Sequence, residues 1–274
     1  MKTSNIGIRI VAGWVALTIA QMVTGTLIRI NWPNAGTTFR WVLLTNLLMV
    51  AVLGYLASRT DLRGWKLGVV LASIPCAVGI ANLIEGAVFL TKVEIPWSRV
   101  GGQVFATYLL VAPMWSWIFG RSAPGHASFW DPKPPASKAW RFGVSDLAYV
   151  AFYFIAGMII FPMVRDFYAT QTVPQPAQIV GLQLLVRGPI FIAICLVMLR
   201  LLGFSRLTGA VMVGLLFAVL SGVVPLLAPN PFFPDAVRWV HFGEVTISNF
   251  LFAFVVAWLW GPSKEHAVLF AKHA

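Results

Sequence analysis

Three residues near the end of the chain have the types and the spacing that chemistry requires. His241, Glu244 and Ser248 stand at positions i, i+3 and i+7, so a helix carries all three on one face. An imidazole beside a carboxylate can transfer a proton, contact a ligand or hold a metal ion. Asn249 follows directly and adds an amide. This segment is therefore the first candidate for a site.

A second group of candidates lies in two other apolar segments. Asn82 and Glu85 share one helical face within residues 67–90, and Arg187 interrupts residues 177–202. A charge at the centre of a bilayer costs about 2.5–3.5 kcal/mol, and arginine keeps its charge. Because these groups reach similar depths, we expect Arg187 to form an ion pair with Glu85, with Glu244 or with both.

The dipeptide Gly188-Pro189 directly follows this arginine. Proline removes one backbone hydrogen bond of a helix and bends it. Carbonyl groups freed in this way are tolerated inside a membrane only beside protein or water. The dipeptide therefore predicts a bend at this point and a cavity wall formed by the middle of the segment.

The elements that must position these side chains are long apolar segments. Only 11% of the 274 residues are charged, whereas a soluble domain carries about 25%. A helix that crosses a bilayer needs about 20 apolar residues, and the segments are continuous rather than alternating. We predict an all-α polytopic membrane protein with about eight transmembrane helices, over residues 7–29, 40–58, 67–90, 101–120, 145–164, 177–202, 207–228 and 238–260.

The second half of the chain resembles the first. IAQMVTGTLIR (19–29) matches IAGMIIFPMVR (155–165), and WIFGRS (117–122) matches WLWGPS (258–263). Four spans in each copy make the two repeats parallel. We predict a first four-helix repeat over 1–122, an irregular cytoplasmic linker over 123–141, and a second repeat with a short cytoplasmic tail over 142–274.

Within this alignment, several polar positions of the first half correspond to candidate residues of the second. The pairs are Asn46 with Arg187, Gln103 with Glu244, Thr107 with Ser248 and Tyr108 with Asn249. The first half thus carries neutral groups where the second half carries charged ones. We expect these positions to face one shared interior.

The formal net charge of +11 follows the topology of a membrane protein rather than that of a nucleic-acid-binding protein. Of the 20 lysines and arginines, thirteen fall on the side of the N-terminus, six fall on the opposite side, and Arg187 lies within a span. This bias predicts a bacterial-type inner membrane location with both termini in the cytoplasm. The lipid bilayer is the expected partner, a membrane-protein partner or homo-oligomer stays open, and nucleic acid is not expected.

These residues predict a polar cavity in the outer half of the membrane, lined by Asn82, Glu85, Arg187, His241, Glu244, Ser248 and Asn249. The leading hypothesis is binding or transport of a small solute, ion or proton, with a small molecule or ion as ligand. The alternatives are an intramembrane enzyme that uses acid–base chemistry on a lipid-like substrate, and a non-catalytic subunit of a membrane complex. No sequence signature identifies a cofactor. A metal site of His241, Glu244 and Glu85 is disfavoured because only one histidine lies within a predicted span.

The connection over residues 229–236, PNPFFPDA, belongs to the outer side in this topology. Aromatic side chains are common where a membrane meets water. We expect its two phenylalanines to enter the headgroup region, with the loop acting as a structural cap.

Overall fold

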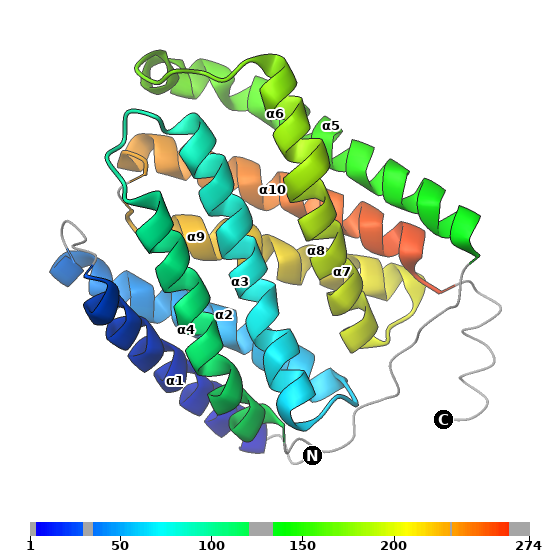
Figure 1. The fold of residues 1–274 in the computed structure, drawn as a ribbon. Coiled ribbons are helices and arrows are strands. Elements are labelled where there is room, and N and C mark those ends of the chain that lie inside the picture. Colours follow the sequence, from blue (N-terminus) through cyan, green and yellow to red (C-terminus); the bar gives the residue numbers. More distant parts are fainter. Residues whose placement is uncertain (1–3, 30–34, 121–133, 231, 263–274) are drawn as a thin grey trace.

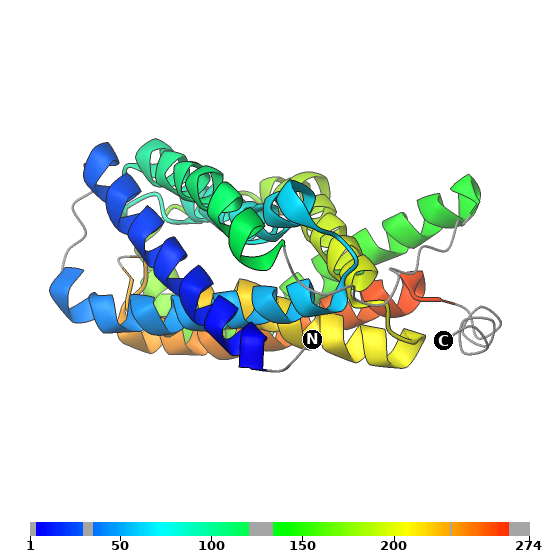
Figure 2. The ribbon, with the colours of Figure 1, turned by 90° about the horizontal axis from the view of Figure 1, so that it is seen from below.

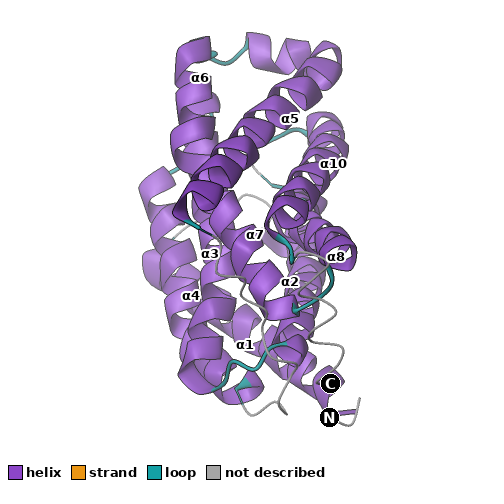
Figure 3. Ribbon diagram, turned by 90° about the vertical axis from the view of Figure 1, so that its right-hand side faces the viewer, coloured by secondary structure: helices purple, strands orange, loops and turns teal. Residues whose placement is uncertain are grey.

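The computed structural model describes residues 4–29, 35–120, 134–230 and 232–262, and these residues form only helices and connecting loops (Figures 1 and 3). The elements, with π-helical turns written η, are α1 (Ser4–Ile28), α2 (Ala35–Arg59), α3 (Gly64–Phe89), α4 (Trp97–Phe119), α5 (Pro135–Ala169), α6 (Pro176–Leu182), η1 (Gln183–Arg187), α7 (Gly188–Leu202), α8 (Arg206–Ala218), η2 (Val219–Val223), α9 (Val224–Leu227) and α10 (Asp235–Trp260). The predicted all-α class is confirmed for the described part of the chain.

Among the described residues, seven helical stretches are long and apolar enough to cross a membrane. They are Ile6–Ile28, Thr38–Arg59, Gly64–Phe89, Pro135–Ala169, Pro176–Leu202, Arg206–Leu227 and Asp235–Trp260. The chain is therefore a multi-pass membrane protein that contacts the lipid bilayer. The predicted span 101–120 forms α4 (Trp97–Phe119), which is long but is not among these seven stretches. The predicted count of eight spans is thus supported for seven.

Contacts between connecting segments define two ends of the bundle. At one end, Gly64 N–H donates to the carbonyl of Gly120, and Trp260 Nε1 donates to Ser145 Oγ. We call this the terminal end, because α1 begins and α10 ends there (Figure 1). The other end, which we call the capped end, is formed by the connections 90–96, 170–175 and 228–234. There, Thr172 N–H donates to Thr91 Oγ1.

The last long helix of each half has the same kind of neighbours. Helix α4 packs against α1 and α3, and α10 packs against α5 and α8. The halves meet where α2 and α3 contact α7 and where α2 contacts α9. Figure 2 shows α3, α4 and α7 on one side of the molecule and α2, α8 and α10 on the other. The interior between these two groups is where residues from both halves can meet.

Close helix contacts depend on glycine at two comparable places. A Cβ atom at Gly68 of α3 would lie 2.5 Å from the carbonyl oxygen of Ala112 in α4. A Cβ atom at Gly222 of η2 would lie 2.7 Å from the Cα atom of Thr246 in α10. Small residues let helix backbones approach one another in this way inside membranes.

Two π-helical turns interrupt the second half, and each precedes a proline. Turn η1 ends at Arg187, just before Gly188-Pro189, and η2 ends just before Val224-Pro225. Since proline cannot donate a backbone hydrogen bond, the helix accommodates it here with a wider turn. The predicted disturbance at Gly188-Pro189 is therefore a π turn within a continuous helical span from Pro176 to Leu202.

Two sequence-based expectations about local structure need correction. Helix α5 begins at Pro135, so the end of the segment predicted as an irregular linker (123–141) is helical, while residues 123–133 lie outside the described part. Proline is well suited to the first turn of a helix, because its fixed φ matches the helix and its missing N–H is not needed there. The lysine and arginine that follow Pro135 did not indicate a helix by hydropathy.

The expectation of one shared polar interior is also wrong. Asn46 Nδ2 donates to Gln21 Oε1 at 2.7 Å, and the hydroxyls of Thr24 and Thr107 are 2.7 Å apart. Gln103 Nε2 donates to the carbonyl of Gln21. These groups bond to one another between α1, α2 and α4. None of them lines the cavity described below.

Candidate functional site

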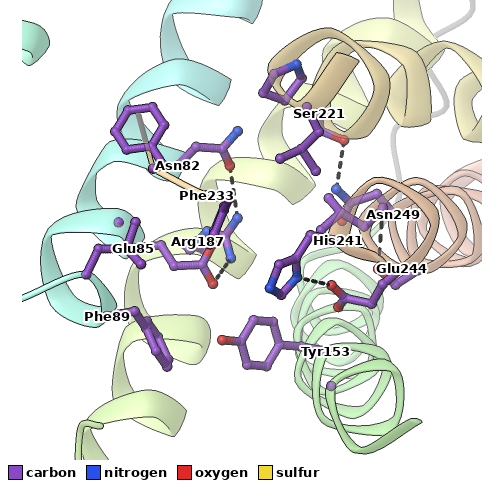
Figure 4. Close-up of a pocket in the computed structure, with 18 of the residues that line it drawn as sticks. Asn82, Glu85, Phe89, Tyr153, Arg187, Ser221, Phe233, His241, Glu244 and Asn249 are labelled. Carbon is purple, nitrogen blue, oxygen red and sulfur yellow. Dashed lines mark hydrogen bonds and ion pairs between the residues drawn. The ribbon is translucent and has the colours of Figure 1, made fainter. Parts of the chain in front are cut away.

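A cavity of 720 Å³ lies between the two halves of the bundle, toward the capped end. Its walls come from α3, α4, α5, α6, η1, η2, α9, α10 and the connections of the capped end. All seven residues predicted from the sequence line it: Asn82, Glu85, Arg187, His241, Glu244, Ser248 and Asn249. Figure 4 shows Asn82, Glu85 and Arg187 on one side, with His241, Glu244 and Asn249 facing them. That these residues bind a ligand stays a prediction.

The first polar group on the wall is an arginine cluster formed by Asn82, Glu85, Gln183 and Arg187. Nη1 of Arg187 lies 2.6 Å from Oε1 of Glu85 and donates to Oε1 of Gln183, and Nη2 donates to Oδ1 of Asn82 at 2.9 Å. Gln183 Nε2 donates to the same Glu85 oxygen. The predicted ion pair between Arg187 and Glu85 is therefore confirmed, and it joins η1 to α3 across the two halves.

The guanidinium group of this cluster is enclosed. The side chain of Arg187 is only 5% exposed, and its Cζ atom lies 5.8 Å from the centre of the Tyr149 ring and 5.0 Å from that of Phe191. Its Nε is buried without a hydrogen-bond partner in the structure. Aromatic faces favour a cation, and the carboxylate compensates its charge. Arg187 is thus held in place, and its bonds to Glu85, Gln183 and Asn82 leave it poorly placed to bind an anion.

The second polar group is a histidine cluster formed by Tyr168, His241 and Glu244. Nδ1 of His241 lies 3.0 Å from Oε2 of Glu244, and Nε2 lies 3.0 Å from the hydroxyl of Tyr168. Because a carboxylate can only accept, Nδ1 is the donor, and in the neutral ring Nε2 accepts from Tyr168. Glu244 is therefore paired with its own helix neighbour. Among the described residues it forms no ion pair with Arg187, which was one of the predicted alternatives.

The remaining predicted residues have modest roles in the wall. Asn249 is buried and donates to Ser221 Oγ at 2.9 Å, and Ser221 in turn donates to the carbonyl of Phe217. The Ser248 hydroxyl bonds weakly to the carbonyl of Val245 in its own helix. Turn η2 thereby places Ser221 against α10, where the amide nitrogen of Asn249 and the hydroxyl of Ser221 are bonded within the protein.

Two carboxylate oxygens on the wall have no hydrogen-bond partner among the described residues. The bonds of Glu85 all involve Oε1, and those of Glu244 involve Oε2. Neither Oε2 of Glu85 nor Oε1 of Glu244 is among the fully enclosed unpaired atoms. Both are therefore accessible from the cavity and are available to accept hydrogen bonds from a ligand.

Sequence reasoning missed several polar members of the wall, among them Tyr168 and Ser221. Tyr168 lies beyond the predicted end of span 145–164, whereas α5 continues to Ala169. Ser221 appeared to be an ordinary small residue in an apolar segment. Gln183 does not line the cavity but supports the arginine cluster from behind the wall, and its position four residues before Arg187 is the spacing that places both on one helix face.

The rest of the wall is apolar and strongly aromatic. Helix α5 supplies Phe152, Tyr153, Phe154, Met158, Ile160, Phe161 and Val164, and the other elements add Leu83, Phe89, Leu90, Trp97, Val100, Val104, Val173, Ile179, Pro225, Leu226, Phe232 and Phe233. Within the described ranges, no group of three or more His, Cys, Asp or Glu residues is arranged to hold a metal ion. The few polar groups thus stand in a large apolar enclosure.

Aromatic contacts close the capped end. The ring of Trp97 stacks on that of Phe232 with centroids 5.7 Å apart, and the ring of Phe233 lies 4.9 Å from His241. Lys92 N–H donates to Gln171 Oε1, which joins two of the connections above the cavity. The expected entry of Phe232 and Phe233 into the headgroup region stays a prediction, and both rings line the cavity. Burying them there removes apolar surface from water.

Comparisons with models of protein families, with curated proteins and with solved structures found no match to this chain.

Proposed function

We propose that this membrane protein binds a lipid-like amphiphile in the cavity between its two halves. The observation that carries the proposal is the composition of the wall, in which two small polar clusters face each other within a large apolar and aromatic surface. Ligand sites of this size commonly combine an apolar lining with a few polar groups that orient the ligand. A polar head between the clusters and an apolar body along α5 match both parts of this wall.

The lining of α5 also supports access from the lipid. Phe154, Met158 and Phe161 lie at i, i+4 and i+7, so they share one face of the helix. Met158 is 66% exposed and Phe161 is 52% exposed, although both line the cavity. No atom lies within 4 Å of a Cβ atom built on Gly157. Side chains that belong to both the cavity and the surface indicate an opening at this place.

Helices α3 and α4 contribute Gly79, Leu83 and Val104 to the wall of the same cavity. Since the opening lies along apolar spans, the surface around it faces acyl chains rather than water. The capped end, in contrast, is covered by the Trp97–Phe232 stack. This combination favours an amphiphile from the bilayer over the small solute, ion or proton of the leading sequence-based hypothesis.

Photolabelling from the membrane tests the proposal. The protein is reconstituted into phosphatidylcholine liposomes that contain a long-chain alcohol with a diazirine in its chain, and adducts are mapped by mass spectrometry. We expect adducts on Tyr149, Ser221 and Asn249, which line the cavity but are at most 5% exposed, so the probe reaches them only from inside. Gly157→Trp should lower this yield by filling the opening. Ile159→Trp is the matched control, because Ile159 is exposed on the same helix and does not line the cavity.

Two outcomes of the same liposome experiment would contradict the proposal. Adducts restricted to lipid-facing residues would show that the alcohol does not enter the cavity. Oxidation of Tyr149 and Tyr153 by hydroxyl radicals generated in water, without alcohol adducts on either residue, would indicate an aqueous path. That outcome would favour the transport of a solute or ion instead.

A second candidate function is acid–base catalysis on the bound amphiphile. It is favoured by the histidine cluster, in which Glu244 orients one nitrogen of His241 and the other nitrogen contacts Tyr168. A carboxylate that orients an imidazole is a recurrent arrangement in proton-transferring enzymes. Mass spectrometry of lipids from the same liposomes would detect a chemically altered amphiphile, and an unaltered pool would favour binding alone.

We further propose that the chain contains two parallel four-helix repeats and that α4 completes the first. Support comes from the equivalent neighbours of α4 and α10. The predominance of lysine and arginine on the side of the N-terminus favours a bacterial-type inner membrane with the terminal end toward the cytoplasm. In that orientation the cavity lies in the outer half of the membrane.

A further inference from the structure

The charges of the cavity wall limit which polar head the proposed amphiphile can have. Glu85 and Glu244 each bring a carboxylate, whereas Arg187 brings one guanidinium group. His241 in its neutral form adds no charge. The wall therefore carries one more negative than positive charge in this state, and the positive charge is already engaged with Glu85.

The hydrogen-bonding atoms that remain accessible also restrict the chemistry of the ligand's polar head. Nη1 and Nη2 of Arg187 donate to Glu85, Gln183 and Asn82, and its Nε is enclosed. The atoms left accessible on the charged side chains are acceptors, namely Oε2 of Glu85 and Oε1 of Glu244. The side chain of Glu244 is only 9% exposed, so a ligand that bonds to its free oxygen does so shielded from bulk water. Hydrogen bonds to such a charged acceptor are the stronger kind.

Aromatic rings surround the space between the two acids. Figure 4 shows Tyr153 directed into the cavity between Glu85 and Glu244, with Phe89 and Phe233 nearby. Phe233 also packs on the ring of His241. Carboxylates together with aromatic rings attract an ammonium group, through charge and through cation–π contact. An anionic head would instead meet two carboxylates and an arginine that is already bonded.

We propose that the cavity selects amphiphiles whose head is a hydrogen-bond-donating cation, such as a long-chain amine, over amphiphiles with an anionic head. The inference rests on the proposed function, because it concerns the head of the same bound molecule. Glu244 and Glu85 accept the N–H groups of the ammonium, and Arg187 fixes the position of Glu85. The alkyl chain lies along the apolar wall of α5.

Competition against the photoactivatable alcohol tests this selectivity. Dodecylamine, dodecanol and dodecanoate are compared at equal membrane concentration, and adduct yield at Ser221 is measured. We expect dodecylamine to displace the probe most effectively and dodecanoate least. Glu244→Gln should weaken the competition by dodecylamine about tenfold, as expected for a lost hydrogen bond to a charged group, and should affect dodecanol little. Glu94→Gln is the control, because Glu94 is exposed at the capped end and does not line the cavity.

The outcomes separate this inference from the proposed function. Competition by dodecanoate equal to or better than that by dodecylamine would overturn the selectivity while leaving the amphiphile site intact. An amine preference that is unchanged in Glu244→Gln would also overturn the assignment of the head. Absence of probe adducts at Ser221 would instead overturn the proposed function. The comparison of the three probes on the unmodified protein stands even if Glu244→Gln fails to fold.

Discussion

The ion pair between Arg187 and Glu85 should make a measurable contribution to the stability of the bundle. Removing one member of a buried pair costs about 3–5 kcal/mol, because the other charge loses its compensation. Glu85 is 24% exposed to the cavity, and a glutamine in its place can still accept from Arg187. We therefore expect Glu85→Gln to lower the free energy of unfolding by about 2 kcal/mol, which is typical of a hydrogen bond to a charged group.

Unfolding with sodium dodecyl sulfate in mixed micelles, followed by circular dichroism, gives the required free energies. The cycle of Glu85→Gln, Arg187→Gln and the double variant isolates the energy of the contact, and we expect a coupling of about 1–2 kcal/mol. Glu94→Gln serves as a control that should remain within about 0.5 kcal/mol of the unmodified protein. If Glu85→Gln behaves like this control, or if the two single changes add within about 0.5 kcal/mol, the pair does not stabilise the fold.

Two further predictions concern packing and the capped end. Gly68→Ala should destabilise the protein by about 1–3 kcal/mol in the same unfolding assay, because the new Cβ atom would lie 2.5 Å from the carbonyl oxygen of Ala112. Gly101→Ala is the control and should be neutral or stabilising, since no atom lies within 4 Å of its Cβ position. Equal effects of the two glycine changes would contradict the close contact of α3 and α4. Trp97→Ala removes the stack on Phe232 and should speed oxidation of Tyr153 by hydroxyl radicals from water, and an unchanged rate would mean that the stack does not seal the cavity.

The cost of isolated charge made part of the site predictable from the sequence. Arg187 and Glu85 required partners because neither can remain alone in an apolar span, and their similar depths made Glu85 one of the two expected partners of Arg187. The partner of Glu244 was harder to identify, since His241 on the same helix face competes with a distant arginine. A contact between residues i and i+3 does not depend on how helices pack against each other, and in the structure Glu244 bonds to His241.

Hydropathy placed the long apolar helices but could not describe the details that shape the cavity. It ended span 145–164 before Tyr168, because Arg165 and Asp166 lower the apolar character there, although the helix continues to Ala169. It also gave no indication of the π turn at Ser221, which depends on how the following proline is accommodated. The place of Phe232 and Phe233 in the cavity wall was not predicted, because a loop sequence does not show which surface its side chains cover.

The polar residues of the two halves show why the shared interior expected from the alignment of the repeats does not form. In the proposed repeat, Asn46 corresponds to Arg187, yet the short amide of Asn46 donates to Thr18 and Gln21 on the adjacent α1, at 3.3 and 2.7 Å. The longer side chain of Arg187 extends from η1 to Asn82 and Glu85 of α3. A short polar group is satisfied within its own half, whereas a long charged one requires a partner across the interface. If the halves arose by duplication, the replacement of neutral by charged groups would therefore have joined the two halves and provided the carboxylates that face the cavity.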